Sequence, residues 1–401
     1  CYKTHQTFRI YCARKCRFRK KKLSEIDRLA EEAIANHYTP GMQILVAKDG
    51  KIVYDKSFGT QDKNSTKKVE WTDLYDVASV TKVTATLPLL MLEVSENKLN
   101  LDQTLGEIDP EAKNSNKSSL KIREVLAHQA GLKPWIGFYN ETVNVKNARL
   151  YLDFYSRKQD EEHQIKVTDN IYIINTIKDT IYEDIYKSSL GRKTYEYSDL
   201  GYYIFKKKIE KNFGKDLNQL TQEKFYQSLG MYRTTFNPKE KFKLEEIIPT
   251  EYDKTYRNQL IHGFVHDQGA AMIGGIAGHA GLFSTSIDMA KLMQMYLNGG
   301  EYGGEVYLKP EVVAEFTKQQ FTGNHRGAGF DKMQTTSKVG PSAESFGHTG
   351  FTGTMVWADP KYNIVYIFLS NRVNEIVEPN YLSIKKIREN IRQLIYDAIL
   401  P

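Results

Sequence analysis

Short runs of apolar, β-branched and aromatic residues occur in pairs near both ends of the chain. Residues 43–48 and 51–57 form the first pair, and Asp49-Gly50 joins them. Asp-Gly between two such runs is a strong signal for a β-hairpin. Residues 352–358 and 364–370 form the second pair, joined by the segment from Asp359-Pro360 to Asn363. The pattern therefore predicts two antiparallel strands at each end of the chain.

Helical spacing of apolar residues is found outside each hairpin and through the middle of the chain. After Ser24, apolar residues stand three or four positions apart and Asp27 completes a capping pair, which predicts a helix that ends before Pro40. Residues 384–400 predict the helix that follows the second hairpin. Further helices are predicted at 79–97, 122–128, 169–186, 200–213, 217–229 and 287–297.

This order of elements predicts one antiparallel sheet built from both chain ends and flanked by helices, with a mainly helical region inserted beside it. The fold class is α/β, in the α+β sense. We expect the sheet part at about 23–78 and 300–401 and the helical part at about 79–299. The Lys-rich stretch 237–258 and the glycine-containing stretch 320–345 are expected as surface loops.

Length and composition indicate a globular protein. The chain has 401 residues, of which 40% are hydrophobic and 26% charged, enough for one large or two modest cores. The longest mostly apolar run, 85–94, is about half the ~20 residues that a membrane span needs, and it contains Pro88. We therefore expect no integral membrane segment.

The positive charge of the chain is concentrated in residues 1–22. The formal net charge is +7, but this tail holds nine Lys or Arg and no acid, so the remainder carries about −2. We interpret 1–22 as a disordered tail or linker remnant, and 23–401 as the folded domain with no nucleic-acid partner. A basic patch for nucleic acid or acidic lipid, or a weak Cys/His metal site in the tail, remains the alternative. Since the first residue is not Met and no signal-peptide stretch follows, we expect a processed chain or a fragment.

All three cysteines also lie in the tail, at Cys1, Cys12 and Cys16. The folded domain therefore has no thiol for a disulfide, a thiolate metal site or a cysteine nucleophile. Its chemistry must rely on oxygen and nitrogen.

Ser79 and Lys82 form a Ser-x-x-Lys tetrad at the start of the predicted helix 79–97. Residues three apart share one face of a helix, near the positive end of its dipole. Only this tetrad leads into an apolar run, where burial would make the lysine reactive. The same spacing recurs in charged surroundings, at Ser65/Lys68, Ser95/Lys98, Ser118/Lys121 and Ser383/Lys386.

Two further motifs follow in order: Tyr197-Ser198-Asp199, before the predicted helix 200–213, and Gly347-His348-Thr349-Gly350, before the strand 352–358. With the tetrad they resemble the signature of the serine β-lactamase and penicillin-binding-protein superfamily. The intervals of 118 and 151 residues and the run 124–132 are similar to those of its class C β-lactamase, esterase and D-aminopeptidase branch. The resemblance covers about 23–401 and implies the β-lactamase/penicillin-binding-protein-like fold.

The resemblance implies a serine hydrolase that works through an acyl-enzyme, without a metal or an organic cofactor. Ser79 attacks the carbonyl, and Lys82 and Tyr197 move its proton to the leaving group. The backbone N–H groups of Ser79 and Phe351 form the oxyanion hole. The resemblance also implies that Thr349 and Gly350 border the substrate, with Gly350 allowing the strand to approach it closely.

Two residues depart from the family pattern. His348 replaces a lysine, so a mostly neutral group stands where a permanent cation would bind a substrate carboxylate. Asp199 replaces an asparagine, so it favours the ammonium form of Lys82 and accepts hydrogen bonds without donating any. A cap for the following helix is the alternative role of Asp199. Both changes favour an ester or an uncharged-end amide over a β-lactam or D-Ala-D-Ala.

The expected substrate is therefore a small-molecule carboxylic ester or D-amino-acid-type amide. A β-lactam or a cell-wall muropeptide is the second choice, and a catalytically silent domain that binds wall fragments is the rival of another class. The runs 263–267 and 274–285 resemble a bacterial envelope subgroup. That resemblance suggests the periplasm or cell envelope and a covalent fusion to an upstream family-3 glycoside hydrolase domain.

Other residues invite a weaker functional interpretation. His262 and His266 have the spacing of zinc ligands on a helix, but no metalloprotease Glu accompanies them. His128 and His279 are interpreted as structural, hydrogen-bonded histidines. After Gly131, three aromatic residues are candidates for the edge of an acyl pocket: Trp135, Phe138 and Tyr139.

Overall fold

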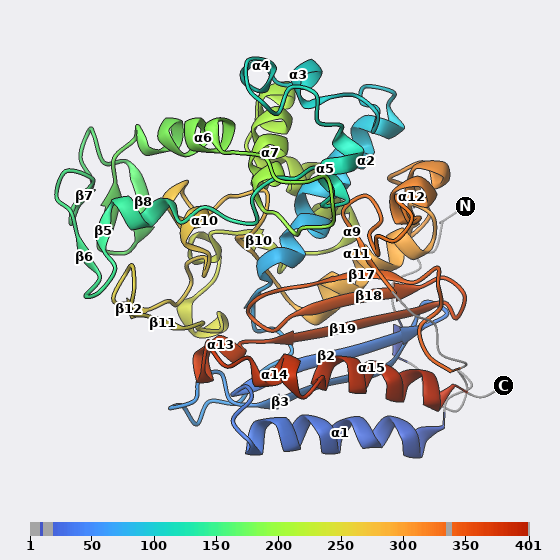
Figure 1. Cartoon of the computed structure of the whole chain (residues 1–401). Helices are drawn as coiled ribbons and strands as arrows, with labels where there is room; N and C mark the ends of the chain where they lie inside the picture. Colours follow the sequence, from blue (N-terminus) through green and yellow to red (C-terminus); the bar gives the residue numbers. More distant parts are fainter. Residues whose placement is uncertain (1–8, 11–18, 334–338, 400–401) are drawn as a thin grey trace.

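The computed structural model describes residues 9–10, 19–333 and 339–399 (Figure 1). Its main sheet has the strand order β1-β3-β2-β19-β18-β17-β16. All neighbours pair antiparallel except β1 and β3. The strands span β1 Arg9–Ile10, β2 Gly41–Lys48, β3 Lys51–Gly59, β16 Asp331–Lys332, β17 Phe346–Thr349, β18 Met355–Asp359 and β19 Ile364–Ser370.

The two chain ends meet in the middle of this sheet, as predicted. Strand β2 pairs with the whole of β19, from Met42 opposite Ser370 to Lys48 opposite Ile364. The predicted hairpins β2–β3 and β18–β19 flank this junction. One sheet therefore joins residues more than 300 positions apart in the sequence.

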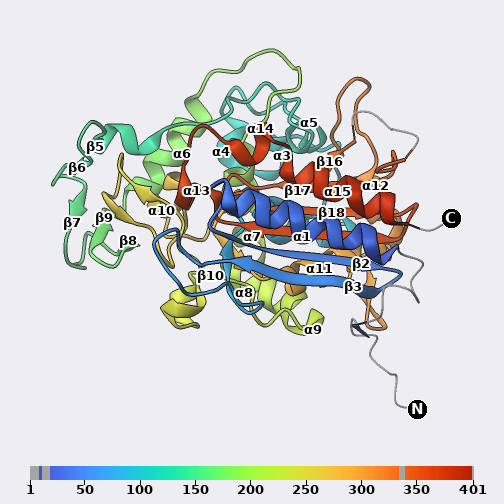
Figure 2. The ribbon, with the colours of Figure 1, turned by 90° about the horizontal axis from the view of Figure 1, so that it is seen from below.

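Both faces of the central strands are buried. Ile364, Tyr366 and Phe368 of β19 face α1 (Lys20–Ala35) and α15 (Ile387–Ala398), whereas Val365 and Ile367 belong to the core shared with the helical region. Figures 1 and 2 show α1 and α15 side by side across one face of the sheet. The period-two alternation of a strand thus supplies two separate cores.

The first helix begins at Lys20, four residues before the predicted start at Ser24. Leu23 is buried and extends the apolar stripe of Ile26, Ala30 and Ala33 by one turn toward the N-terminus. The end of the predicted tail therefore belongs to α1, and Arg9–Ile10 pairs with β3. The rest of the predicted tail, 1–8 and 11–18, lies outside the described residues.

The inserted region is largely helical, as predicted, and covers the other face of the sheet (Figure 1). Helix α7, Leu200–Phe213, has the predicted bounds. The prediction for 169–186 was wrong in its first part, because Ile171 and Ile173 face inward in a small sheet with β8 and the helix begins only at Ile177. The helices of this region are α2 Leu87–Ser95, α3 Leu105–Ile108, α4 Pro110–Lys113, α5 Ile122–Leu126, α6 Ile177–Lys187, α7, α8 Leu217–Thr221, α9 Gln227–Leu229, α10 Gln268–Met272 and α11 Ser286–Leu297.

Short strands and C-terminal helices complete the described structure. A three-stranded sheet, β10-β13-β4, leads into the tetrad at residue 79, and β7-β9-β8 lies at the edge of the helical region. No helix in the described ranges combines the length and apolar character that a bilayer crossing requires. The remaining bounds are β4 Tyr75–Asp76, β5 Val143–Asn144, β6 Arg149–Leu150, β7 Tyr155–Ser156, β8 Ile165–Thr168, β9 Ile171–Ile173, β10 Thr235–Phe236, β11 Tyr252–Asp253, β12 Gln259–Leu260, β13 Leu282–Ser284, β14 Glu301–Tyr302, β15 Glu305–Val306, α12 Pro310–Thr317, α13 Arg372–Glu375 and α14 Tyr381–Ile384.

The third motif lies on a strand of its own. Residues 346–349 form β17, and a tight turn connects it to β18, which begins at Met355 and not at Thr352 as predicted. Part of the predicted loop 320–345 also joins the sheet, as β16. The sequence pattern missed β17 because Gly347 and His348 are poor strand formers. Pairing of all four β17 residues with β18 holds them in the sheet.

Candidate active site

Ser79 lies at a sharp junction between strand β4 and the helix that follows. It belongs to a 3-10 turn, Ala78–Val80, in which Ala78 has a φ of 49°. The Ala78 N–H donates to Asp76 Oδ1 at 2.8 Å, which stabilises this left-handed conformation. A π-helical segment, Lys82–Thr86, then leads into α2. Residues in sparsely populated backbone regions cluster at active sites, where surrounding contacts hold them.

Lys82 is fully buried and contacts Ser79, as the tetrad predicts. Its Nζ lies 3.0 Å from Ser79 Oγ, 3.0 Å from the His279 carbonyl oxygen and 2.6 Å from Asp199 Oδ1. An ammonium group has three protons to donate, and three acceptors surround it here.

The pKa of Lys82 is raised, contrary to the expectation that burial makes it a reactive amine. Burial by itself lowers this pKa, but the charge of Asp199, assisted by Tyr197, outweighs it. Lys82 is therefore an ammonium at neutral pH. The expectation that Asp199 favours the ammonium form is confirmed in direction.

Asp199 precedes α7 but does not cap it. No helix N–H donates to its side chain, and the carboxylate instead pairs with Lys82. The Asp199 N–H donates to the Pro134 carbonyl at 3.0 Å, and the Ser198 N–H donates to His128 Nδ1 at 3.1 Å. These contacts aim the carboxylate inward, so the helix-cap alternative was wrong.

Tyr197 brings its ring to the same place. Its ring centroid lies 5.2 Å from Lys82 Nζ and 4.4 Å from the ring of His128. Its hydroxyl is buried, and the side chains of Lys82 and Ser79 interact with it. Burial raises the pKa of Tyr197, and the opposing effect of the Lys82 charge is smaller, so the group is a neutral phenol.

His348, on β17, is a neutral acceptor. Its Nδ1 lies 2.7 Å from the Thr349 carbonyl, so Nδ1 carries the proton, and Nε2 has no partner among the described residues. Burial, followed by the charges of Arg326 and Lys82, holds its pKa well below the usual value. The expected neutral charge is confirmed.

Gly350 allows close backbone packing against the Ser79 junction; it also lines the cavity, and the close approach to a substrate that the resemblance implies stays a prediction. A Cβ on Gly350 would collide with the Val77 carbonyl and with Thr354 Oγ1. The hydroxyls of Thr352 and Thr354 donate to the carbonyls of Asp76 and Val77, at 2.8 and 2.9 Å. The turn after β17 is thereby clamped onto the Ser79 junction. Thr349 and Phe351 border the same cavity as Ser79.

These residues meet in one cavity of about 740 Å³. It contains every predicted site residue except Lys82, which lies behind Ser79 and is fully buried. Trp135 and Tyr139 line it as predicted, whereas Phe138 is buried against Tyr203. Its walls consist of Ala78, Ser79, Pro134, Trp135, Tyr139, Tyr195, Tyr197, Asp199, Glu251, His266, Asp267, Gln268, His279, Ala280, Arg326, His348, Thr349, Gly350, Phe351, Val377, Asn380, Ser383 and Arg388.

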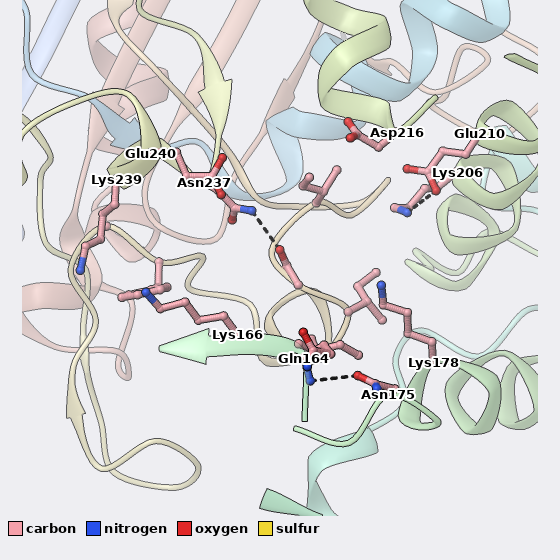
Figure 3. A pocket seen from close by; sticks show the side chains of 16 residues that line it. Gln164, Lys166, Asn175, Lys178, Lys206, Glu210, Asp216, Asn237, Lys239 and Glu240 are labelled. Atoms are coloured by element: carbon pink, nitrogen blue, oxygen red, sulfur yellow. Dashed lines mark hydrogen bonds and ion pairs between the residues drawn. The ribbon is translucent and has the colours of Figure 1, made fainter. Parts of the chain in front are cut away.

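A second cavity, of about 520 Å³, lies apart from Ser79 and is drawn in Figure 3. Its lysines are largely neutralised: Lys166 and Lys239 both pair with Asp169, and Lys206 pairs with Glu210. The described residues around it include no Ser, Thr, Tyr or Cys nucleophile. We therefore place the candidate active site at the first cavity.

Arg326 was missed by sequence reasoning. It is 6% exposed, lines the cavity and lies 5.4 Å from the Tyr197 ring. Its Nη2 donates to the Tyr195 hydroxyl at 3.1 Å, and Asp331 is 3.9 Å from Nε. Nε and Nη1 have no hydrogen-bond partner among the described residues. It lies in the loop before β16, where no local pattern distinguishes it from a surface arginine.

The four other histidines considered above have separate contacts. His128 accepts from Ser198, and His279 stacks on Tyr203 at 4.3 Å, which fits the predicted structural roles. His262 Nε2 faces the Ile247 carbonyl at 2.6 Å, whereas His266 pairs with Glu251 at 3.3 Å. The two zinc-spaced histidines therefore do not converge on one point.

Comparisons with known proteins agree with the motifs. The family profile described as Beta-lactamase matches residues 26–386. The chain belongs to the β-lactamase family. It is 32% identical, over 89% of its length and 84% of the relative's, to an Escherichia coli O157:H7 protein named "Putative D-alanyl-D-alanine carboxypeptidase". It is 30% identical, over 92% of its length and 86% of the relative's, to a Bacillus subtilis protein named N-acetylmuramyl-L-alanine amidase.

The fold is that of β-lactamases and penicillin-binding proteins, as the resemblance implies. A class C β-lactamase structure, 15% identical, superposes with a TM-score of 0.65 over 95% of this chain and 97% of that one. Membership of the family, with the relatives above, identifies the chain as a serine hydrolase of the β-lactamase type that acts on ester or amide bonds. The suggested upstream glycoside hydrolase domain stays a prediction.

Proposed function

We propose that this enzyme hydrolyses an amide bond in muropeptides of the bacterial cell wall, with Ser79 as the nucleophile. The contact of Ser79 Oγ with the buried Lys82–Asp199 pair carries the catalytic part of the proposal. The names of the relatives at 30–32% identity support a wall amide as the substrate class. Such a substrate implies a location in the bacterial envelope.

The proton of Ser79 moves to Asp199 through Lys82. Lys82 gives one proton to the Asp199 carboxylate and takes the hydroxyl proton of Ser79 as Oγ bonds to the substrate carbonyl carbon. The charge of Lys82 is the same before and after, which avoids an isolated charge in a buried site. The Ser79 and Phe351 N–H groups stabilise the oxyanion, each by about 3–4 kcal/mol.

Tyr197 acts as the general acid. Its raised pKa keeps the hydroxyl protonated, so it gives this proton to the leaving nitrogen as the amide C–N bond breaks. The phenolate then recovers a proton from Asp199 through Lys82. Water repeats the sequence on the acyl-enzyme, with its proton following the route taken by that of Ser79.

Arg326 supports a substrate with a carboxylate. The replacement of lysine by His348 removes one cation from the cavity, but Arg326 supplies another. Its Nη1 has no hydrogen-bond partner among the described residues, and Asp331 is 3.9 Å from its Nε. A buried guanidinium with free donors binds a carboxylate through charge-assisted hydrogen bonds. The stem peptides of muropeptides carry such groups, whereas simple esters do not.

An assay of three substrates tests the proposal: a D-Ala-D-Ala-ended stem peptide, muramyl dipeptide and a short-chain nitrophenyl ester. We expect a higher kcat/KM for one of the wall amides than for the ester. Ser79→Ala should lose about 10³-fold or more, whereas Ser65→Ala, in another Ser-x-x-Lys tetrad, should not change the rate. A clear preference for the ester would overturn the proposal.

Ester hydrolysis is the second candidate, favoured by the neutral His348. The silent wall-binding domain is the third. A fluorophosphonate probe distinguishes it, because an active Ser79 is labelled in the wild type and not in Ser79→Ala. No labelling of the folded wild type would favour the silent domain.

A further inference from the structure

Two aromatic side chains form a supported wall in the catalytic cavity. Trp135 is 47% exposed, and its ring centroid lies 6.2 Å from that of Tyr139. Tyr139 stacks on Tyr256 at 5.3 Å with an interplanar angle of 25°. Tyr256 is buried, and Tyr155 donates to its hydroxyl at 3.0 Å. Tyr256 and Tyr155 therefore hold the Tyr139 ring in position before any ligand binds.

Phe351 adds another exposed ring to this cavity. It is 48% exposed, although His266 lies 5.5 Å from it and the Arg372 guanidinium 4.7 Å. Large exposed aromatic rings in a concave site are typical of ligand contact, since leaving them in water costs free energy. Polar side chains border the same space, among them Gln268 and Asn380.

We propose that Trp135 and Tyr139, with Phe351, bind the pyranose ring of the N-acetylmuramyl unit. This inference rests on the proposed function and identifies the bond that is cleaved. The C–H faces of a pyranose fit the negative faces of aromatic rings, and its hydroxyl and acetamido groups need polar partners such as Gln268 and Asn380. A plain acyl chain would gain nothing from the polar groups of this cavity.

A sugar inside the catalytic cavity places the bond near it at Ser79. The amide between the lactyl group of the sugar and the first alanine is adjacent to the ring. The D-Ala-D-Ala bond is four residues further along the stem, roughly 13 Å away in an extended chain. The serine therefore takes the lactyl carbonyl as acyl group, and the stem peptide leaves with its amine protonated by Tyr197 and its carboxylate held by Arg326.

Trp135→Ala tests the sugar contact with two matched substrates. Muramyl dipeptide carries the sugar, and N-lactoyl-L-alanyl-D-isoglutamine is the same compound without it. We expect the KM for muramyl dipeptide to rise at least 10-fold with little change in kcat, and no change for the lactoyl compound. Trp71→Ala is the control, because Trp71 is 56% exposed and does not line the cavity. Equal losses on both substrates, or no loss on either, would overturn the inference.

Other outcomes separate this inference from the proposed function. If the wild type cleaves D-Ala-D-Ala peptides and leaves muramyl dipeptide intact, the sugar contact is wrong and the wall-amide function stands. If the wild type cleaves no wall amide, the proposed function fails. Trp135→Phe, with thermal unfolding as a check, retains a stacking ring. Retention of the wild-type KM by this variant supports stacking, whereas the full Trp135→Ala loss contradicts it.

Discussion

Lys82 and Asp199 form a buried ion pair, with 2.6 Å between Nζ and Oδ1, directly behind the Ser79 hydroxyl. The family pattern has an asparagine at the position of Asp199, so this pair is a departure that changes the charge of the proton-transfer group. It makes Lys82 a donor to Ser79 in the resting enzyme. In the proposed mechanism, the carboxylate is the final acceptor of the serine proton.

Asp199→Asn should lower kcat/KM by about 10²–10⁴-fold, because it removes that acceptor. Asp199→Glu, which retains a carboxylate, should recover part of the rate. The measurement is the pH profile of kcat/KM for both variants. The mechanism is wrong if Asp199→Asn is as active as the wild type at pH 7.

The same substitution should reduce the free energy of unfolding by about 3–5 kcal/mol at pH 7, because it leaves a buried ammonium without its counter-charge. The pKa of folded Lys82 is raised above its ordinary value of 10.5. The stabilisation is therefore fully present below that pH and is lost only as the pH rises through the higher folded pKa. Urea unfolding should therefore show the same loss of stability in the variant at pH 7 and at pH 10, both below 10.5, and equal stability of variant and wild type at pH 7 would contradict the prediction.

Arg326→Gln should raise the KM for a free-acid substrate by about 10- to 100-fold, the usual loss when a charged hydrogen bond is removed. A substrate whose carboxylates are amidated should show no such loss in the variant. The comparison of acid and amide substrates is the measurement. An equal rise in KM for the acid and the amidated substrate would contradict carboxylate binding by Arg326 and would mean that the residue only supports the folded structure.

Gly350→Ala should lower the free energy of unfolding by about 1–3 kcal/mol, because the added methyl group enters occupied space. Activity should fall as well, since Val77 and Ala78 hold Ser79 and would have to move. Gly191→Ala is the matched control, because its new methyl group meets no atom closer than 3.7 Å. Urea unfolding and the acylation rate are measured together. If the free energy of unfolding and the acylation rate are both unchanged in Gly350→Ala, the close contact of the turn after β17 with Val77 and Ala78 does not hold Ser79 in place.

Acid should destabilise the protein through His128 and His348. The pKa of each is held well below 6.5, by burial first and then by nearby cations. Below pH 6.5 these histidines therefore bind protons in the unfolded chain but not in the folded one. The free energy of unfolding falls by up to about 1.4 kcal/mol per pH unit for each histidine.

His348→Asn should reduce this slope between pH 7 and 5, as measured by urea unfolding. His37→Asn is the control, since the His37 side chain is 80% exposed. An unchanged slope in His348→Asn would show that another group causes the acid sensitivity.

The sequence by itself determined the local elements and the ordered motifs. Asp49-Gly50 predicted the first hairpin, and the bounds of α7 followed from its apolar spacing. Ser79 and Lys82 are three residues apart, so one helical turn is enough to bring them together. These predictions succeeded because the interacting groups are neighbours in the chain.

The tertiary structure alone decided the charges and the remaining walls of the site. Asp199 lies 117 residues from Lys82, and only packing determines whether its carboxylate caps α7 or faces the ammonium. His348 stands in a strand because β18 pairs with it, and Arg326 reaches the cavity from a loop without a local signal. A sequence pattern records spacing along the chain, whereas pKa values and cavity walls depend on desolvation and on neighbours that are remote in the sequence.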